Sequence, residues 1–176
     1  MQVHEAVVTD LPGILAIYND AVLNTTAVWN ETVVDLENRR AWLAERDRLG
    51  YPVLVAVENG EVLGYASFSD FRAWDGYRYT VEHSVYVRSD KRRLGIGRAL
   101  LTPLVDWARE LGKHVMVAGI EASNEASIRL HTRLGFKKVG QLEQVGTKFG
   151  RWLDLVFMQF TLNEPAEGDR PGAHSR

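Results

Sequence analysis

The sequence of 176 residues contains no cysteine, so it can form neither disulfides nor thiolate metal sites. The same absence excludes a covalent thioester intermediate on the protein. The histidines are scattered, and none pair at the spacing of metal ligands, so we expect no metal. They are His4, His83, His114, His131 and His174.

Long hydrophobic runs and an excess of charge of either sign are also absent. No apolar run approaches the ~20 residues that span a bilayer, and Met1–Glu5 shows no basic segment leading into an apolar core, as a secretory signal would. With 21 Lys and Arg against 23 Asp and Glu, the net charge is −2. We therefore expect a cytoplasmic protein that binds neither membranes nor nucleic acid through bulk charge.

The chain length suits one domain. Its 176 residues, 45% of them hydrophobic, can form one full-sized core, and no repeat or linker divides them. We expect a single domain over 1–162. The segment 163–176 is rich in proline, glycine and charge, and it is predicted to be a mobile tail.

Hydrophobic periodicity and turn signals predict the order β-α-α-β-β-β-α-β-α-β-β. Asp35 is expected to cap the second helix, which Gly50 closes, and Asn59-Gly60 is a strong hairpin signal. Strands flank each of the last two helices, which implies crossover units and an α/β fold whose mixed sheet has helices on both faces. The predicted strands are 3–8, 53–57, 61–66, 80–87, 115–120, 137–144 and 152–162, with loops over 69–79 and 146–150.

One turn suits a phosphate group. The segment Arg92-Arg93-Leu94-Gly95-Ile96-Gly97-Arg98 follows an apolar run and opens an apolar-periodic helix. Glycines let backbone N–H groups approach an anion, and the helix N-terminus adds unpaired donors and partial positive charge. No Lys-Ser or Lys-Thr follows the second glycine, which excludes a P-loop, and no third glycine completes a dinucleotide fingerprint. The simpler alternative is an ordinary basic turn.

The order of elements, together with Arg92-x-x-Gly95-x-Gly97, resembles the GNAT superfamily of acetyl-CoA-dependent N-acetyltransferases. A second segment, from Asn124 through Leu134-Gly135-Phe136, is similar to the other common signature of that superfamily. The resemblance covers Val3 to Leu162. The segments 80–87 and 148–154 resemble the phosphinothricin N-acetyltransferase branch, including relatives that acetylate methionine sulfoximine and methionine sulfone. That branch implies a cytoplasmic homodimer acting on the α-amine of small amino-acid-like substrates.

The resemblance implies that acetyl-CoA is the cofactor. Its pantetheine would follow the strand around Tyr86, and its pyrophosphate would rest on the glycine turn. Asn124 would bond the cofactor or only cap its helix, and Arg133 would lie near the phosphorylated end or be an exposed helix charge. The implied cofactor residues are Val85, Tyr86, Val87, Arg92, Arg93, Leu94, Gly95, Ile96, Gly97, Arg98, Asn124 and Arg133.

Two residues are candidates for catalysis. Strand alternation places Glu82 on one face with Ser84 and Tyr86, and a carboxylate among valines is costly to bury unless it has a partner or a role. Glu82 would accept the proton of the amine; the alternative is an ion pair with Arg72 or Arg78. The resemblance puts His131 where many GNAT enzymes carry a tyrosine, as proton donor to the leaving thiolate. A buried structural histidine is the alternative.

The loop before that strand has the composition of a substrate site. Its arginines could bind an α-carboxylate and its aromatics could enclose a small side chain. The alternative is a solvated loop whose aromatics pack on helices or on a second subunit. The candidate substrate residues are Arg72, Trp74, Asp75, Gly76, Tyr77 and Arg78, and Trp29, Phe149 and Trp152 could complete the pocket across a dimer interface.

These observations predict acetyl transfer from acetyl-CoA to the α-amine of methionine sulfone, methionine sulfoximine or phosphinothricin. With no cysteine available, transfer should be direct within a ternary complex. Two alternatives stay open. The acceptor could be a polyamine, an aminoglycoside or a protein N-terminus, or the chain could be a non-catalytic acyl-CoA-binding module.

Overall fold

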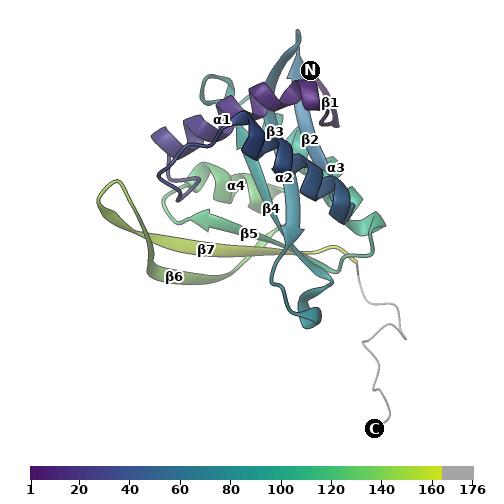
Figure 1. Cartoon of the computed structure of the whole chain (residues 1–176). Helices are drawn as coiled ribbons and strands as arrows, with labels where there is room; N and C mark the ends of the chain where they lie inside the picture. Colours follow the sequence, from purple (N-terminus) through teal and green to yellow (C-terminus); the bar gives the residue numbers. More distant parts are fainter. Residues whose placement is uncertain (164–176) are drawn as a thin grey trace.

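The computed structural model describes residues 1–163 (Figure 1). The predicted tail therefore lies outside the described residues except for Asn163, whose side-chain amide donates to the carbonyl of Lys113 (3.0 Å). The elements are β1 (Gln2–Glu5), α1 (Leu11–Asn24), α2 (Leu36–Leu49), β2 (Val53–Glu58), β3 (Glu61–Asp70), β4 (Thr80–Val87), α3 (Ile96–Glu110), β5 (Val115–Glu121), α4 (Glu125–Arg133), β6 (Lys137–Lys148) and β7 (Arg151–Thr161), with 3-10 turns at Val8–Asp10, Asp75–Tyr77 and Ser89–Lys91.

The strands form one sheet in the order β1-β2-β3-β4-β5-β7-β6. Only β4 and β5 are parallel, joined by the crossover helix α3; every other neighbouring pair is antiparallel. The predicted mixed sheet and order of elements are confirmed. Helices α1 and α2 cover one face of the sheet, and α3 and α4 cover the other (Figure 1).

Two hydrophobic layers hold these faces together. On one side, the buried leucines Leu100, Leu101 and Leu104 of α3 lie in one cluster with Phe68 and Met116. On the other side, α1 and α2 pack on the sheet through a smaller cluster that includes Tyr65 of β3. The alternation of Tyr65 and Phe68 between the two clusters follows from the period of two along a strand.

Most predicted boundaries hold because their caps form. The Asp35 carboxylate accepts from the N–H of Asn38 (2.8 Å), Gly50 closes α2 with a φ of 69°, and Asn59-Gly60 makes the predicted hairpin turn. The first strand is shorter than predicted, since the Asp10 carboxylate accepts from the N–H of Val7 and a 3-10 turn replaces its end.

Both predicted loops, 69–79 and 146–150, are longer than the loops in the structure. Strand β3 continues to Asp70, paired with Val81, so the loop that was expected from residue 69 begins after it. Strand β6 continues to Lys148, and the turn is the pair Phe149-Gly150, with φ of 52° and 72°. Phenylalanine rarely adopts a positive φ, so the residue types here do not predict this two-residue turn.

Candidate active site

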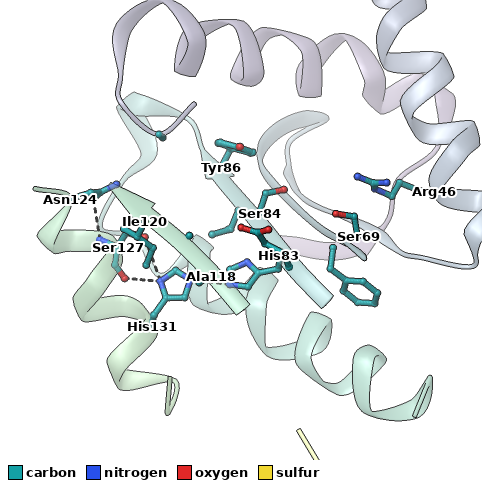
Figure 2. Close-up of a pocket in the computed structure, with 15 residues that line it drawn as sticks. Arg46, Ser69, His83, Ser84, Tyr86, Ala118, Ile120, Asn124, Ser127 and His131 are labelled. Atoms are coloured by element: carbon teal, nitrogen blue, oxygen red, sulfur yellow. Dashed lines mark hydrogen bonds between the residues drawn. The ribbon is translucent and has the colours of Figure 1, made fainter. Parts of the chain in front are cut away.

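The site is a cleft where β4 and β5 separate. The two strands pair only from Thr80–Val115 to Glu82–Val117. Beyond that point β4 continues to Val87, and its β5-facing edge meets no strand of the described chain. A cleft of about 310 Å³ opens there (Figure 2). Its walls come from β3, β4, β5 and α4, with Ala27 from the α1–α2 loop and Arg46 from α2.

Glu82 lies in this cleft on the face covered by α1 and α2. It stands opposite Ser69 in the β3–β4 register, so the two side chains share a face. No arginine or lysine of residues 1–163 forms an ion pair with it, which excludes the alternative pairing with Arg72 or Arg78 within the chain. Burial raises the pKa of the Glu82 carboxyl, and the charge of Arg72 opposes that rise. A raised pKa makes the Glu82 carboxylate a stronger base, which suits it to accept a proton.

Gly119 of β5 makes room for this carboxylate. A Cβ atom at position 119 would lie 3.0 Å from Oε1 of Glu82, tighter than ordinary van der Waals contact. The missing side chain therefore keeps the wall opposite Glu82 open.

His131 and His83 form a buried pair on the other face of β4. Their Nε2 atoms lie 3.1 Å apart, and the rings are nearly parallel, with planes inclined by 16°. Nδ1 of His131 lies 2.7 Å from the carbonyl of Ser127, which can only accept, so His131 carries its proton on Nδ1. Its Nε2 must then accept from Nε2–H of His83. The one N–H of His131 is thus engaged with the backbone.

The pair is neutral at pH 7. Burial lowers the pKa of His83 to about 3, with a smaller contribution from His131, and burial also lowers the pKa of His131. The tautomer argument leaves a lone pair on Nδ1 of His83, and this buried nitrogen has no hydrogen-bond partner in the described part of the chain. His83 lines the cleft, so the lone pair is a candidate acceptor for a donor bound there.

The glycine turn presents unpaired amides. Within residues 1–163, the backbone N–H groups from Arg92 to Arg98 donate to no carbonyl or side chain. Arg93 and Gly95 have φ of 67° and 79°, and left-handed residues in such a turn align successive N–H groups into a concave anion site. The turn is exposed apart from Ile96 and Gly97. It can therefore bind a phosphate group at the start of α3.

The remaining cofactor candidates differ in position. Asn124 lines the cleft, and its side-chain oxygen caps α4 by accepting from the N–H of Ser127 (3.1 Å). Val85 and Tyr86 also line the cleft, and the Tyr86 ring contacts that of Tyr65 (centroids 5.2 Å apart). Arg133 is an exposed residue at the end of α4.

None of the predicted substrate residues lines the cleft in this chain. The loop that holds them is exposed, with Arg72 stacked on Phe71 (4.1 Å) and Arg78 donating to the carbonyl of Asp75 (2.9 Å). The three aromatics proposed to complete the pocket do not reach it either. Trp29 packs on Gly146, while Phe149 and Trp152 are exposed on the β6–β7 hairpin.

Several cleft residues were missed from the sequence. Strand alternation puts His83 on the face opposite Glu82 but indicates no role for it, and Ser69 falls within the predicted loop 69–79. Arg46 is one of several arginines of α2, and nothing in its neighbours distinguishes it. In Figure 2 its side chain extends from α2 toward Ser69 and Ser84.

A sheet split between two parallel strands, with an anion-binding turn after the first, defines a class of acyl-transfer folds. The model of the acetyltransferase (GNAT) family matches residues 14–136, and this chain belongs to that family.

The chain is 64% identical over 162 residues to an L-methionine sulfoximine/L-methionine sulfone acetyltransferase of Pseudomonas aeruginosa, covering 92% of this chain and 94% of the relative. Two solved structures hold acetyl-CoA. An acetyltransferase from Salmonella typhimurium has a TM-score of 0.93 at 58% identity, covering 96% of this chain and 98% of that one. A phosphinothricin acetyltransferase from Sinorhizobium meliloti has a TM-score of 0.89 at 39% identity, covering 97% and 95%.

The glycine turn can be tested by coenzyme A binding. A side chain at Gly95 disfavours its left-handed backbone by about 1–2 kcal/mol, so Gly95→Ala should distort the turn and weaken binding about 5- to 30-fold by calorimetry. Gly112 has a similar φ of 70° just after the other end of α3 and serves as the matched control. Gly112→Ala should leave the affinity unchanged. Equal affinities for both variants and the parent would contradict the assignment.

The neutral histidine pair predicts a pH-dependent stability. The unfolded chain protonates His83 near pH 6.5 and the folded chain only near pH 3, so the unfolded state binds more protons between these values. The contribution of His83 is present above about pH 6.5 and lost as the pH falls, at up to about 1.4 kcal/mol per pH unit. The free energy of unfolding, measured with urea between about pH 7 and pH 5, should fall less steeply for His83→Asn than for the parent protein as the pH drops. Parallel curves for the two proteins would refute this.

Proposed function

We propose that this protein transfers the acetyl group of acetyl-CoA directly to the α-amine of a small amino-acid analogue such as methionine sulfone, methionine sulfoximine or phosphinothricin. One observation carries the proposal: the split between β4 and β5 holds a carboxylate, Glu82, and the glycine turn with its backbone amides follows at the end of β4, and neither the carboxylate nor these amides have a partner among residues 1–163. The names of the relatives support the acceptor class.

The residues present fit acetyl-CoA as the donor. The unpaired N–H groups from Arg92 to Arg98 would hold its pyrophosphate, and the free edge of β4 from Val85 to Val87 would hold its pantetheine through backbone hydrogen bonds. Asn124 would contact it from the start of α4. When bound, acetyl-CoA supplies a thioester carbonyl, which backbone N–H groups near Tyr86 and Val87 would polarise.

Glu82 would prepare the amine. An α-ammonium cannot attack a carbonyl, so its proton passes to the Glu82 carboxylate, directly or through a water molecule. The amine lone pair then forms the new C–N bond while the C–S bond breaks. The nitrogen loses a second proton as it becomes an amide, and this proton would pass to the departing thiolate, which leaves as the free thiol of coenzyme A. Because the chain has no cysteine, no thiol can carry the acetyl group between these events.

The hydrogen bonds of His131 leave little scope for its predicted role as proton donor to the leaving sulfur. Its single N–H donates to Ser127, and Nε2 accepts from His83. It could protonate the departing sulfur only in a form in which one of these bonds opens. The structural alternative accounts for the arrangement without such a change.

Arg72 and Arg78 are proposed to bind the α-carboxylate of the acceptor. The charge of Arg72 already acts on Glu82, which supports a position near the amine. The single domain, the cytoplasmic location and the homodimer, in which Trp74 and the β6–β7 aromatics could lie at an interface, stay predictions based on the sequence and on the family resemblance.

A substrate panel tests the function. The protein and acetyl-CoA are mixed with methionine sulfone, methionine sulfoximine, phosphinothricin, a polyamine, an aminoglycoside and a peptide, and the release of free thiol is followed. The amino-acid analogues should react fastest, and initial rates at varied concentrations of both substrates should give intersecting double-reciprocal lines. Parallel lines with an isolable acetylated protein would refute direct transfer, and thiol release only with the other amines would refute the acceptor class.

Glu82→Gln should lower kcat by about 10²- to 10⁴-fold, the usual range for a lost general base. Because the pKa of Glu82 is raised, kcat/KM of the parent should fall as the pH drops through that pKa, and this acidic limb should be reduced in the variant. The Tm should not fall, since the substitution removes a buried carboxylate that has no ion-pair partner. Unchanged kcat with an unchanged pH profile would show that Glu82 is not the base.

A further inference from the structure

Arg46 places a positive charge in the cleft, and no carboxylate of residues 1–163 pairs with it. It is half-buried, its Nε is buried, and this nitrogen has no hydrogen-bond partner within residues 1–163. No carboxylate of the described chain lies within ion-pair distance of it. Its neighbours on α2 are engaged, since Arg48 pairs with Glu45 (2.7 Å) and Arg39 donates to the side chain of Asn38.

The two carboxylates whose charges act on Arg46 have other partners: Glu45 pairs with Arg48, and Asp70 has contacts of its own. Asp70 accepts from the Tyr51 hydroxyl and lies 3.7 Å from the ammonium of Lys113. Arginine keeps its proton in proteins, so Arg46 cannot relieve its burial by becoming neutral. A buried donor without an acceptor costs free energy. The arrangement is therefore incomplete without an oxygen acceptor in the cleft.

The position of Arg46 indicates which part of an acceptor it would meet. Arg46, Ser69 and Glu82 all line the cleft, and α2 covers the face of the sheet on which Ser69 and Glu82 lie side by side. The Ser69 hydroxyl makes no hydrogen bond with any described residue. Arg46 forms no ion pair with Glu82, so its guanidinium does not contact the proposed base. The α-carboxylate, adjacent to the amine, is assigned above to Arg72 and Arg78, which leaves Arg46 for the distal end of the acceptor.

We propose that Arg46 and Ser69 form a subsite for the oxygens on the distal tetrahedral sulfur or phosphorus of the acceptor. This inference rests on the proposed function. Sulfone, sulfoximine and phosphinate groups all carry oxygens that accept hydrogen bonds, and guanidinium and hydroxyl groups supply donors. A thioether sulfur is only a weak acceptor. Arg46 is thus a specificity-determining residue, which favours the oxidised side chain over an unoxidised one of equal length.

Methionine sulfone and methionine provide a matched pair of acceptors. The parent protein should prefer the sulfone. Arg46→Leu should lower kcat/KM for the sulfone about 10- to 100-fold, as expected for lost hydrogen bonds to a charged group, while kcat/KM for methionine changes by less than about 3-fold. Arg46→Lys keeps the charge and one donor group, so it should recover part of the preference. Arg48→Leu, on the same helix and outside the cleft, should alter neither substrate.

Thermal unfolding of each variant shows that the comparison is made on folded protein, and the Lys variant serves where Leu lowers the Tm below the assay temperature. An equal loss for both acceptors would overturn the inference, because it would assign Arg46 to a group that both share. An unchanged preference would overturn it as well. If the parent acetylates neither acceptor, the proposed function itself fails and this inference fails with it.

Discussion

The site depends on one feature of the sheet: the hydrogen bonding between β4 and β5 stops after a few residues. Strand β4 is bonded to β3 along its length, and β5 is bonded to β7 along its length, yet the two inner strands share only the pairs from Thr80–Val115 to Glu82–Val117. Each half of the sheet is stable by its own outer pairing, so the right-handed twist can carry the halves apart. The separation leaves backbone donors and acceptors of β4 free at a point inside the domain. A ligand that follows this edge restores the missing hydrogen bonds.

Unsatisfied polar groups gather at the same place. Of the buried side-chain nitrogen and oxygen atoms that lack partners in the described chain, Arg46 Nε and His83 Nδ1 belong to residues that line the cleft, and only the Tyr65 hydroxyl does not. Apart from Tyr65, the buried side-chain polar groups elsewhere in residues 1–163 have partners. Ser67 donates to the carbonyl of Pro52 (2.8 Å), and the buried ammonium of Lys148 donates to the carbonyl of Val28. Native proteins leave few such groups unpaired, so their concentration here supports a ligand site in the cleft.

The caps and turns, which depend on residues close together in the chain, could be predicted from the sequence. The caps at Asp35 and Asn124, the Asn59-Gly60 turn and the glycine turn are each specified by residues in contact along the chain, and the structure forms all of them. Hydrophobic periodicity supplied the order of elements, and the strands that flank the last two helices indicated the mixed sheet. Arg46 and His83 were beyond reach because their roles depend on contacts between elements distant in sequence, such as His83 of β4 with His131 of α4. The turn at Phe149-Gly150 was missed because a bulky residue with positive φ goes against the preferences that sequence reading uses.

The alternation of β4 gives the two sides of the cleft different electrostatics. Glu82 faces the charged side together with Arg46, while His83 faces the side where a neutral histidine pair packs against Phe136. A slip of one residue between β4 and β3 would exchange these faces. It would bury the carboxylate against the aromatic core and turn the histidine toward the acceptor. The burial of Val81 and His83 opposes that slip, since both lie on the face packed by α3 and α4. The core on one side of the strand therefore fixes the position of the proposed base on the other.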